Sequence, residues 1–138
     1  MKTSCFKEYT GDMGVSVCIY PPIDWNGLRF LPLEPERSMF YAIKNKQLNQ
    51  KKYEQLYKEN VLSKLDPQKI YNMFRDNVLL CWEEPIFDKN YNIINEGDGF
   101  CHRHIISKWI WENLNIEIKE WRKENEIIKK DTNTISLF

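Results

Sequence analysis

The feature of this sequence that most constrains its fold is the run Val78-Leu79-Leu80-Cys81-Trp82. These residues are apolar and lack the alternation that marks a half-exposed strand, and Glu83-Glu84-Pro85 ends the run. An unalternating apolar strand is typical of the centre of a parallel sheet, where both faces of the strand are covered. The run therefore predicts a sheet with residues 78–82 as a central, buried strand.

Helical segments are expected on both sides of this strand. Apolar residues recur at helical spacing over residues 36–45 and again over residues 49–65, where Asn49 is a favourable N-cap. Asp66-Pro67 places an N-cap before a proline at the first helical position, which predicts a third helix ending near residue 75. A fourth, amphipathic helix is expected to begin near Cys101.

Three other segments are expected to be strands. Val15–Tyr20 is β-branched and mostly apolar, Leu28–Leu31 is short, and Ile116–Trp121 alternates between apolar and polar residues. Strands that alternate with helices predict a single α/β domain that is Rossmann-like, with a mostly parallel sheet flanked by helices on both faces. We expect this domain to span residues 1–121, followed by a charged C-terminal extension over residues 122–138.

Charge and composition exclude several classes of protein. Twenty Lys and Arg residues balance twenty Asp and Glu residues, whereas proteins that grip duplex nucleic acid carry a basic excess. An aromatic content of 14% argues against disorder. The chain has no apolar stretch near the ~20 residues that span a membrane, and no targeting segment follows Met1. We therefore expect a cytoplasmic protein that binds neither duplex nucleic acid nor a membrane.

The densest cluster of chemically versatile residues is Cys101-His102-Arg103-His104, which follows the glycine-containing turn at residues 97–100. In parallel sheets, ligands bind outside the carboxyl ends of the strands, and a helix that begins there offers unpaired N–H groups to an anion. Arg103 would add a bidentate clamp. The alternative is that Cys101 packs under the helix while the His and Arg side chains face solvent.

Other candidate ligand-binding residues lie near the same edge. Glu83 and Glu84 follow the central strand, where a buried carboxyl group could act as an acid or base, although a solvated strand end has the same sequence. Cys81 is a further candidate. The aromatic residues Tyr20, Trp25 and Trp82 would either stack on a planar ligand or pack in the core. Arg29 and Arg37 are candidates for a second contact with an anion.

The cysteines allow two further interpretations. The four cysteines, Cys5, Cys18, Cys81 and Cys101, are widely spaced and form no Cys-x-x-Cys motif, so reduced thiols are expected. Cys101 at a helix N-terminus could be a thiolate nucleophile, with Glu83 as acid or base. Cys81, Cys101, His102 and His104 have the chemistry of zinc ligands, but their spacing lacks the usual pattern, so we expect no metal and no cofactor.

The sequence resembles the family called domain of unknown function 488. Members have a strand that ends in Leu-Leu-Cys-x-Glu and a later Cys-His-Arg that opens an apolar helix, as Leu79–Glu83 and Cys101–Arg103 do here. The resemblance covers roughly residues 14–121 and includes the strand before Pro21-Pro22. The sequence is also similar to small phage-borne or bacterial members of the family. The chain departs from the family in a longer connection at residues 84–100 and in the distant position of Arg29. The resemblance implies the α/β fold, since the activity of the family is not established.

These observations favour a protein that binds a small anionic, nucleotide-like molecule at the carboxyl edge of the sheet. In a phage, such a protein would sequester a host nucleotide signal and act in anti-defence. The rival class is a Cys101-dependent enzyme acting on a nucleotide, a base or a sulfur-containing small molecule. A third class is an interaction module, in which the charged C-terminal segment makes a homo-oligomer contact.

Overall fold

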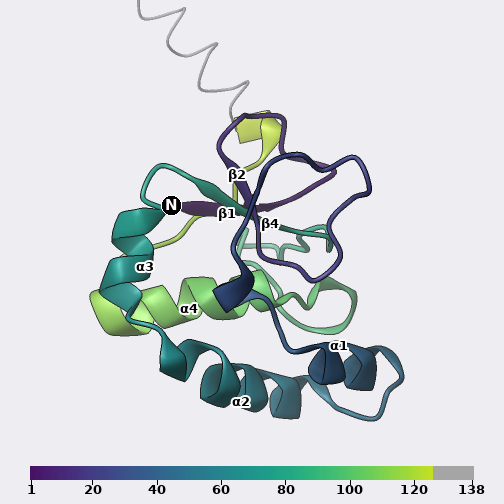
Figure 1. The fold of residues 1–138 in the computed structure, drawn as a ribbon. Helices are drawn as coiled ribbons and strands as arrows, with labels where there is room; N and C mark the ends of the chain where they lie inside the picture. The colour runs from purple at the N-terminus through teal and green to yellow at the C-terminus, as the bar shows by residue number, and fades with distance from the viewer. Residues whose placement is uncertain (126–138) are drawn as a thin grey trace, which may run out of the picture.

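The computed structural model describes residues 1–125, so most of the C-terminal extension predicted for residues 122–138 lies outside the described residues. The strands are β1 (Lys2–Cys5), β2 (Gly14–Ser16), β3 (Leu28–Arg29) and β4 (Val78–Cys81). The α-helices are α1 (Arg37–Lys44), α2 (Gln50–Asn60), α3 (Pro67–Met73) and α4 (His102–Leu114). Short 3-10 helices occupy Leu31–Leu33, Leu62–Lys64 and Gly97–Gly99. Figure 1 shows the sheet above a group of helices.

The four strands form one parallel sheet in the order β1-β4-β2-β3. β4 lies between β1 and β2, with Leu79 opposite both Thr3 and Val15, and all four of its residues are buried. The predicted α/β domain is confirmed, and so is its central strand, although that strand ends at Cys81 and Trp82 is 49% exposed. β1 was not predicted, because its polar Thr3 and Ser4 do not look like a buried strand, although both are 1% exposed.

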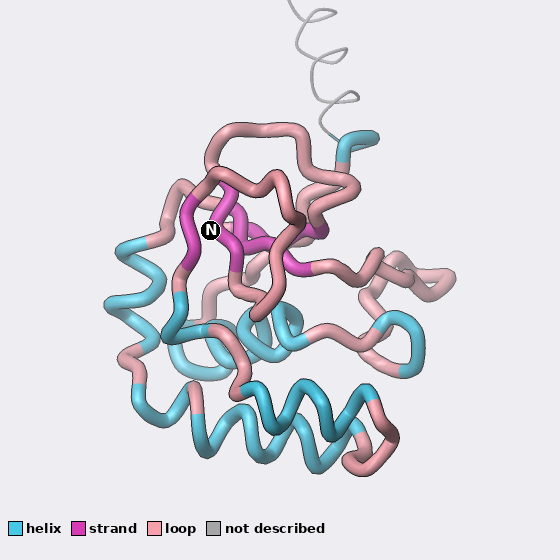
Figure 2. The backbone as a smooth tube through the Cα atoms, turned by 45° about the vertical axis from the view of Figure 1, so that its right-hand side comes forward, coloured by secondary structure: helices cyan, strands magenta, loops and turns pink. Residues whose placement is uncertain are grey.

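The α-helices lie together on one side of the sheet (Figures 1 and 2). The chain crosses from β3 through α1, α2 and α3 to β4, and then from β4 through α4 to Glu120, which bridges Thr3 in parallel. Both connections move across the sheet in the same direction. Because parallel crossovers are right-handed, helices in two such connections fall on the same face. Our expectation of helices on both faces is therefore corrected.

Aromatic side chains from loops cover the other face of the sheet. A Cβ atom on Gly14 of β2 would lie 2.6 Å from Leu80, 3.1 Å from Trp25 and 3.3 Å from Tyr9. The rings of Phe6 and Trp25 meet edge to face with their centroids 5.3 Å apart. This layer explains how β4 is buried on both sides although helices cover only one.

Two of the predicted strands are shorter in the structure, and one is absent. β2 ends at Ser16 and β3 at Arg29, so the strands predicted for residues 15–20 and 28–31 were too long. The alternating segment Ile116–Trp121 makes only the isolated bridge between Thr3 and Glu120. Burial does alternate along this segment, with Ile118 and Glu120 buried and Glu117 and Lys119 exposed, but one of the buried side chains is a carboxylate that pairs with Arg103. None of the described helices is both long and apolar enough to span a membrane.

The predicted helix starts are confirmed at their caps. The Asn49 side chain accepts a hydrogen bond from the Lys52 N–H, and the Asp66 side chain accepts from Gln68 and Lys69. The core between the helices and the sheet includes residues of α2 and α4 that are 0–1% exposed, namely Tyr57, Ile105 and Ile106. This packing fixes the N-terminus of α4 against the ends of β2 and β4.

Candidate functional site

Three cysteines meet at the carboxyl edge of the sheet. Cys18 follows β2, Cys81 is the last residue of β4, and Cys101 is the N-cap of α4. Each is at most 5% exposed, and together they form a small buried cluster, with Phe6 packed against it. All four cysteines of the chain, including Cys5, are free thiols. The topology thus joins sequence positions that are more than eighty residues apart.

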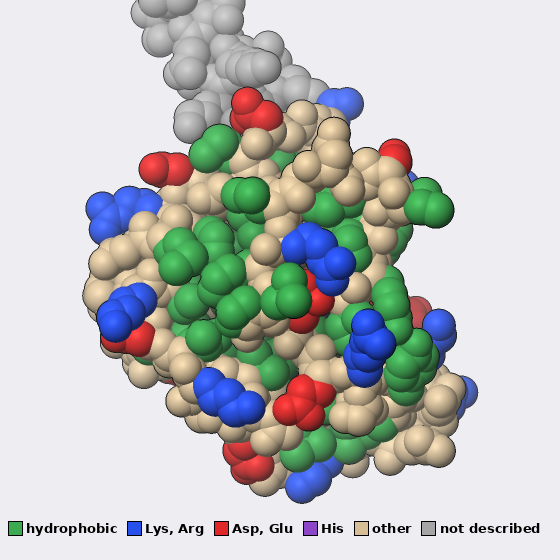
Figure 3. Space-filling view, in the orientation of Figure 1, with side chains coloured by type: hydrophobic (Ala, Val, Ile, Leu, Met, Phe, Trp, Pro, Cys, Tyr) green, Lys and Arg blue, Asp and Glu red, His purple; other side chains and the backbone are tan. Residues whose placement is uncertain are grey.

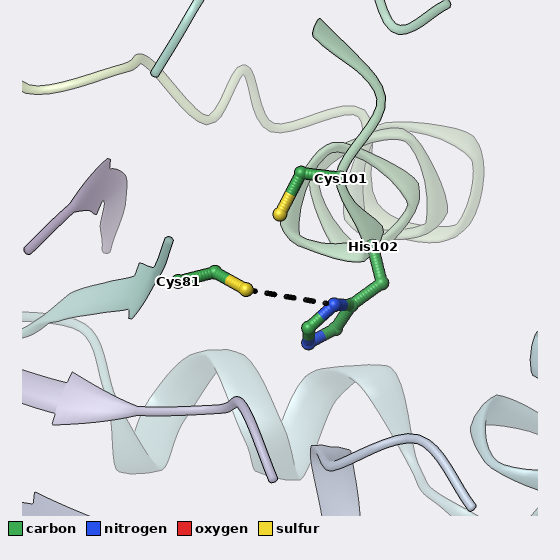
Figure 4. Close-up of side chains that lie close together, drawn as sticks. All are labelled: Cys81, Cys101 and His102. Carbon is green, nitrogen blue, oxygen red and sulfur yellow. Dashed lines mark hydrogen bonds between the residues drawn. The ribbon is translucent and has the colours of Figure 1, made fainter. Parts of the chain in front are cut away.

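His102, the first residue of α4, lies beside these thiols (Figure 4). Its Nε2 lies 2.7 Å from the Val17 carbonyl oxygen, and its Nδ1 lies 3.8 Å from the Cys81 Sγ. A carbonyl oxygen can only accept, so Nε2 carries the proton and donates it to Val17. In the neutral ring, Nδ1 then has its lone pair directed toward Cys81.

The pKa values of the thiols are pushed apart. Burial opposes ionisation of Cys101, but the hydrogen bond from the Cys81 thiol and the positive charge of Arg103 outweigh it and hold the pKa of Cys101 well below its usual range. Hydrogen bonds to Cys101 and Cys18, together with burial, raise the pKa of Cys81. These opposite shifts favour the thiolate form at Cys101 and the thiol form at Cys81.

Glu83 completes this group at the mouth of the site. The residue as a whole is exposed, but its Oε2 lies 3.5 Å from the Cys81 Sγ. The pKa of Glu83 is raised to about 7, mainly because the carboxyl group is partly desolvated and, as the next largest cause, because of the negative charge of Cys101. Glu83 therefore lies where the sequence placed it, next to the cysteines.

A pocket of 640 Å³ opens at this edge of the sheet and includes the three cysteines and His102 in its wall. The surface in Figure 3 is indented above α1, where hydrophobic side chains and Lys or Arg side chains adjoin. Most of the remaining wall is apolar or aromatic, from Ile19, Tyr20, Phe40, Ile43, Tyr53, Trp82 and Phe100. Polar side chains come from Lys44, Lys46, Gln50, Glu83 and Asp98.

Arg103 is not in this pocket, which corrects our expectation that it holds the anion there. Its side chain is 0% exposed, and its Nε and Nη2 donate to the Glu120 carboxylate at 3.1 and 2.7 Å. Thr3 Oγ1 donates to the same carboxylate at 2.8 Å. The guanidinium faces β1 and the 119–121 segment, so its charge is already paired inside the protein. Its positive charge contributes to the lowered pKa of Cys101.

Several other predicted ligand contacts also lie elsewhere. Trp25 packs on Phe6 across the sheet, and its indole N–H donates to the Leu28 carbonyl. Arg29 pairs with Glu34 at 2.9 Å and also donates to the Ile19 carbonyl. The predicted contacts Glu84 and Arg37 lie elsewhere as well. Glu84 pairs with Lys7, and Arg37 is an exposed residue outside the pocket wall. Cys81, Cys101, His102, Glu83, Tyr20 and Trp82 do line the pocket.

The pocket also contains residues that sequence reasoning missed. Phe40 and Lys44 come from α1, Tyr53 from α2, and Lys46 from the turn between these helices. Phe40 and Tyr53 fit the apolar stripes of their helices, so the sequence pattern predicts them to be core residues. Their approach to the end of β4 depends on how the helices cross over the sheet, for which no local pattern gives a signal.

Cys81, Cys101 and His102 also have the chemistry of metal ligands, and their ligand atoms all lie within 4.8 Å of one another. His104, which the sequence placed beside them, is buried on α4 outside this group.

Comparisons with protein-family models, with curated proteins and with solved structures found no match for this chain. The resemblance to domain of unknown function 488 therefore stays a prediction.

Proposed function

We propose that this protein binds a small, planar, anionic molecule of nucleotide type in the pocket at the carboxyl edge of its sheet. The observation that carries the proposal is the lining of the pocket, where aromatic side chains and two lysines surround the N-terminus of α4. Ligands of open parallel sheets bind at this edge.

The aromatic part of the wall suits a flat ring system. Phe40 lies on α1, Tyr53 on α2 and Trp82 directly after β4, so a planar ligand between them would be contacted on more than one side. Stacking of a base on an aromatic side chain contributes about 1–3 kcal/mol and tolerates any base. This part of the wall therefore supports binding of a base but does not select one.

The charged part of the wall suits a phosphate together with hydroxyl or amino groups. Lys44 and Lys46 are exposed, so their charges are available to an anion, in contrast to that of Arg103. Glu83 and Asp98 would accept hydrogen bonds from sugar hydroxyls or exocyclic amino groups. A nucleotide carries both kinds of group, which a simple anion does not.

The test compares nucleoside monophosphates with the matching nucleosides by isothermal titration calorimetry. We expect the phosphate to improve affinity by about ten-fold or more, since a hydrogen bond to a charged group contributes about 1.5–3 kcal/mol. Lys44→Ala and Lys46→Ala should each lose about ten-fold in affinity for the nucleotide. Lys51→Ala, an exposed lysine of α2 outside the pocket, is the matched control and should bind as the parent does.

Equal affinity for nucleosides and nucleotides would overturn the anionic part of the proposal. If no nucleotide or nucleoside binds with a dissociation constant of about 1 mM or lower, the whole proposal is overturned. So would lysine variants that bind as tightly as the Lys51→Ala control.

A further inference from the structure

We propose that Cys81, Cys101 and His102 form a binding site for a zinc-class divalent cation, with a fourth coordination position open to the pocket. The inference goes beyond the proposed function, and it is tested without any nucleotide. Two thiolates and one imidazole are a ligand set that zinc accepts, and three protein ligands with one open position are typical of zinc sites that bind or activate a small molecule.

The distances between the three side chains suit this coordination. Zn–S bonds of ~2.3 Å and Zn–N bonds of ~2.0–2.1 Å place the ligand atoms of a tetrahedral site about 3.4–3.8 Å apart. The Cys81 Sγ and the His102 Nδ1 are already 3.8 Å apart, and all three ligand atoms lie within 4.8 Å of one another. Side-chain rotations that move the sulfur atoms by about 1 Å or less would bring the three ligand atoms to these distances.

The hydrogen bond of His102 prepares the correct nitrogen. Histidine ligands commonly donate their other N–H to a carbonyl or carboxylate, which fixes the ring and its tautomer. Here Nε2 donates to the Val17 carbonyl at 2.7 Å, and Nδ1 is left to face the thiols. In Figure 4 the imidazole extends from the start of α4 toward Cys81 at the end of β4.

Burial also favours a soft divalent cation. Cys81, Cys101 and His102 are 4%, 2% and 6% exposed. Two thiolates would carry two negative charges in this buried place, and a divalent cation neutralises both, whereas an uncompensated buried charge is costly. Thiolate ligands select zinc-class ions over magnesium or calcium, which prefer oxygen.

The fourth position is assigned to the pocket rather than to Cys18. The Cys18 Sγ lies 3.5 Å from the Ser16 Oγ and falls outside the group of mutually close ligand atoms. The three ligands themselves form part of the pocket wall. A water molecule or an anionic group of a bound ligand would therefore complete the coordination from the pocket.

The geometry also explains why these residues lack the usual spacing of zinc ligands in the sequence. Cys101 is the extended N-cap residue, with φ −153°, and His102 is the first helical residue, so adjacent side chains converge on one point. The third ligand comes from a strand twenty residues earlier. No Cys-x-x-Cys or His-x₃₋₅-His pattern is needed for this geometry.

The experiment uses the full chain, reduced and freed of metal with a chelator, and titrates it with Co²⁺ and then with competing Zn²⁺. We expect one equivalent of Co²⁺ to bind, with the visible absorption of tetrahedral cobalt and a thiolate-to-cobalt charge-transfer band. Zn²⁺ should displace it stoichiometrically. Cys81→Ser, Cys101→Ser and His102→Ala should each weaken Zn²⁺ binding more than ~100-fold, beyond the ~10–100-fold lost with outer-shell partners.

Cys5→Ser is the matched control, since Cys5 is a buried free cysteine outside the ligand group, and it should bind zinc as the parent does. Cys18→Ser should change the affinity by less than about three-fold, and a loss as large as that of Cys81→Ser would overturn the open fourth position. If a variant of one of the three ligands fails to fold, the cobalt spectrum and the binding stoichiometry of the parent protein still test whether the metal site exists. An octahedral spectrum, or no stoichiometric binding of either ion, would overturn the site. Alkylation of Cys101 at a rate that Zn²⁺ does not slow would also overturn it, and would favour a free nucleophile instead.

Discussion

Among single residues, Arg103 shows how burial changes the role that a sequence motif suggests. Its guanidinium donates to the Glu120 carboxylate through Nε and Nη2, and Glu120 also accepts from Thr3. The trio connects α4, the 119–121 segment and β1 behind the cluster of cysteines. Arg103 thus stabilises the position of the helix and the thiolate form of Cys101 without touching the pocket.

Removal of the Glu120 charge should destabilise the protein strongly. Glu120→Gln keeps the shape of the side chain but leaves the Arg103 charge buried without its counter-ion, which costs about 3–5 kcal/mol. Urea denaturation followed by circular dichroism measures the loss in the free energy of unfolding. Glu117→Gln, at an exposed position of the same segment, is the control and should stay within about 0.5 kcal/mol of the parent. A similar small loss for Glu120→Gln would show that the ion pair is not needed.

Among helices and turns, the start of α3 shows how local signals fix the boundaries of an element. The Asp66 carboxylate accepts from two backbone N–H groups, and Pro67 occupies the first helical position. These contacts need no tertiary partner, which is why the sequence located them correctly.

The Asp66 cap should contribute a modest and measurable stability. Asp66→Ala leaves the N–H groups of Gln68 and Lys69 without their acceptor, and loss of an N-cap costs about 1 kcal/mol. Thermal denaturation of Asp66→Ala beside Asp24→Ala, an exposed loop position, measures this difference. Equal stabilities of the two variants would contradict the role of Asp66 as a cap.

The turn before α4 should be sensitive to a single methyl group. A Cβ atom on Gly99 would lie 2.5 Å from the Ile94 carbonyl oxygen, which belongs to the backbone and cannot move alone. Gly99→Ala should therefore shift the turn at residues 97–100, of which Gly97, Asp98 and Phe100 line the pocket, and lower the melting temperature. We expect weaker binding of the pocket ligand as well, measured by the calorimetry described above. Unchanged stability and binding would mean that the loop yields freely.

For the molecule as a whole, the order of the strands decides both the layers and the site. β4 is central and wholly buried, while β3 is an edge strand of two exposed residues. Right-handed crossovers then place the helices on one face, and the aromatic loops cover the other. The site lies where β2, β4 and α4 meet.

Hydrogen exchange should follow this order. Backbone amides of β4 should exchange only through global unfolding, because the strand is covered on both faces and paired on both edges. Amides near Leu28 of β3, whose side chain is 65% exposed, should exchange through local opening and hence orders of magnitude faster. Native-state exchange followed by mass spectrometry tests the ranking, and equal protection in both strands would contradict it.

Much of the secondary structure could be predicted because its signals are local. The apolar run at residues 78–82 and the caps at Asn49 and Asp66 depend on neighbouring residues alone, so they keep their meaning in any fold. The polar strand β1 was not predicted, and the strand predicted at residues 116–121 is absent from the structure, because both segments depend on partners far away in the sequence. Thr3 and Glu120 are buried because Thr3 donates to Glu120 and Glu120 pairs with Arg103, and partners so distant in sequence leave no local signal that polar residues will be buried.

The candidate site divides in the same way. By itself, the sequence determined that Cys81, Glu83, Cys101 and His102 would meet at the carboxyl edge of a parallel sheet, since the ends of parallel strands share an edge. Only the tertiary structure decided that Arg103 turns inward to Glu120, that Trp25 lies across the sheet, and that Phe40, Tyr53 and two lysines complete the pocket. The physical reason is that a charge or an aromatic ring is placed by the partner that compensates its desolvation or covers its surface. That partner is chosen by the crossing of helices over the sheet.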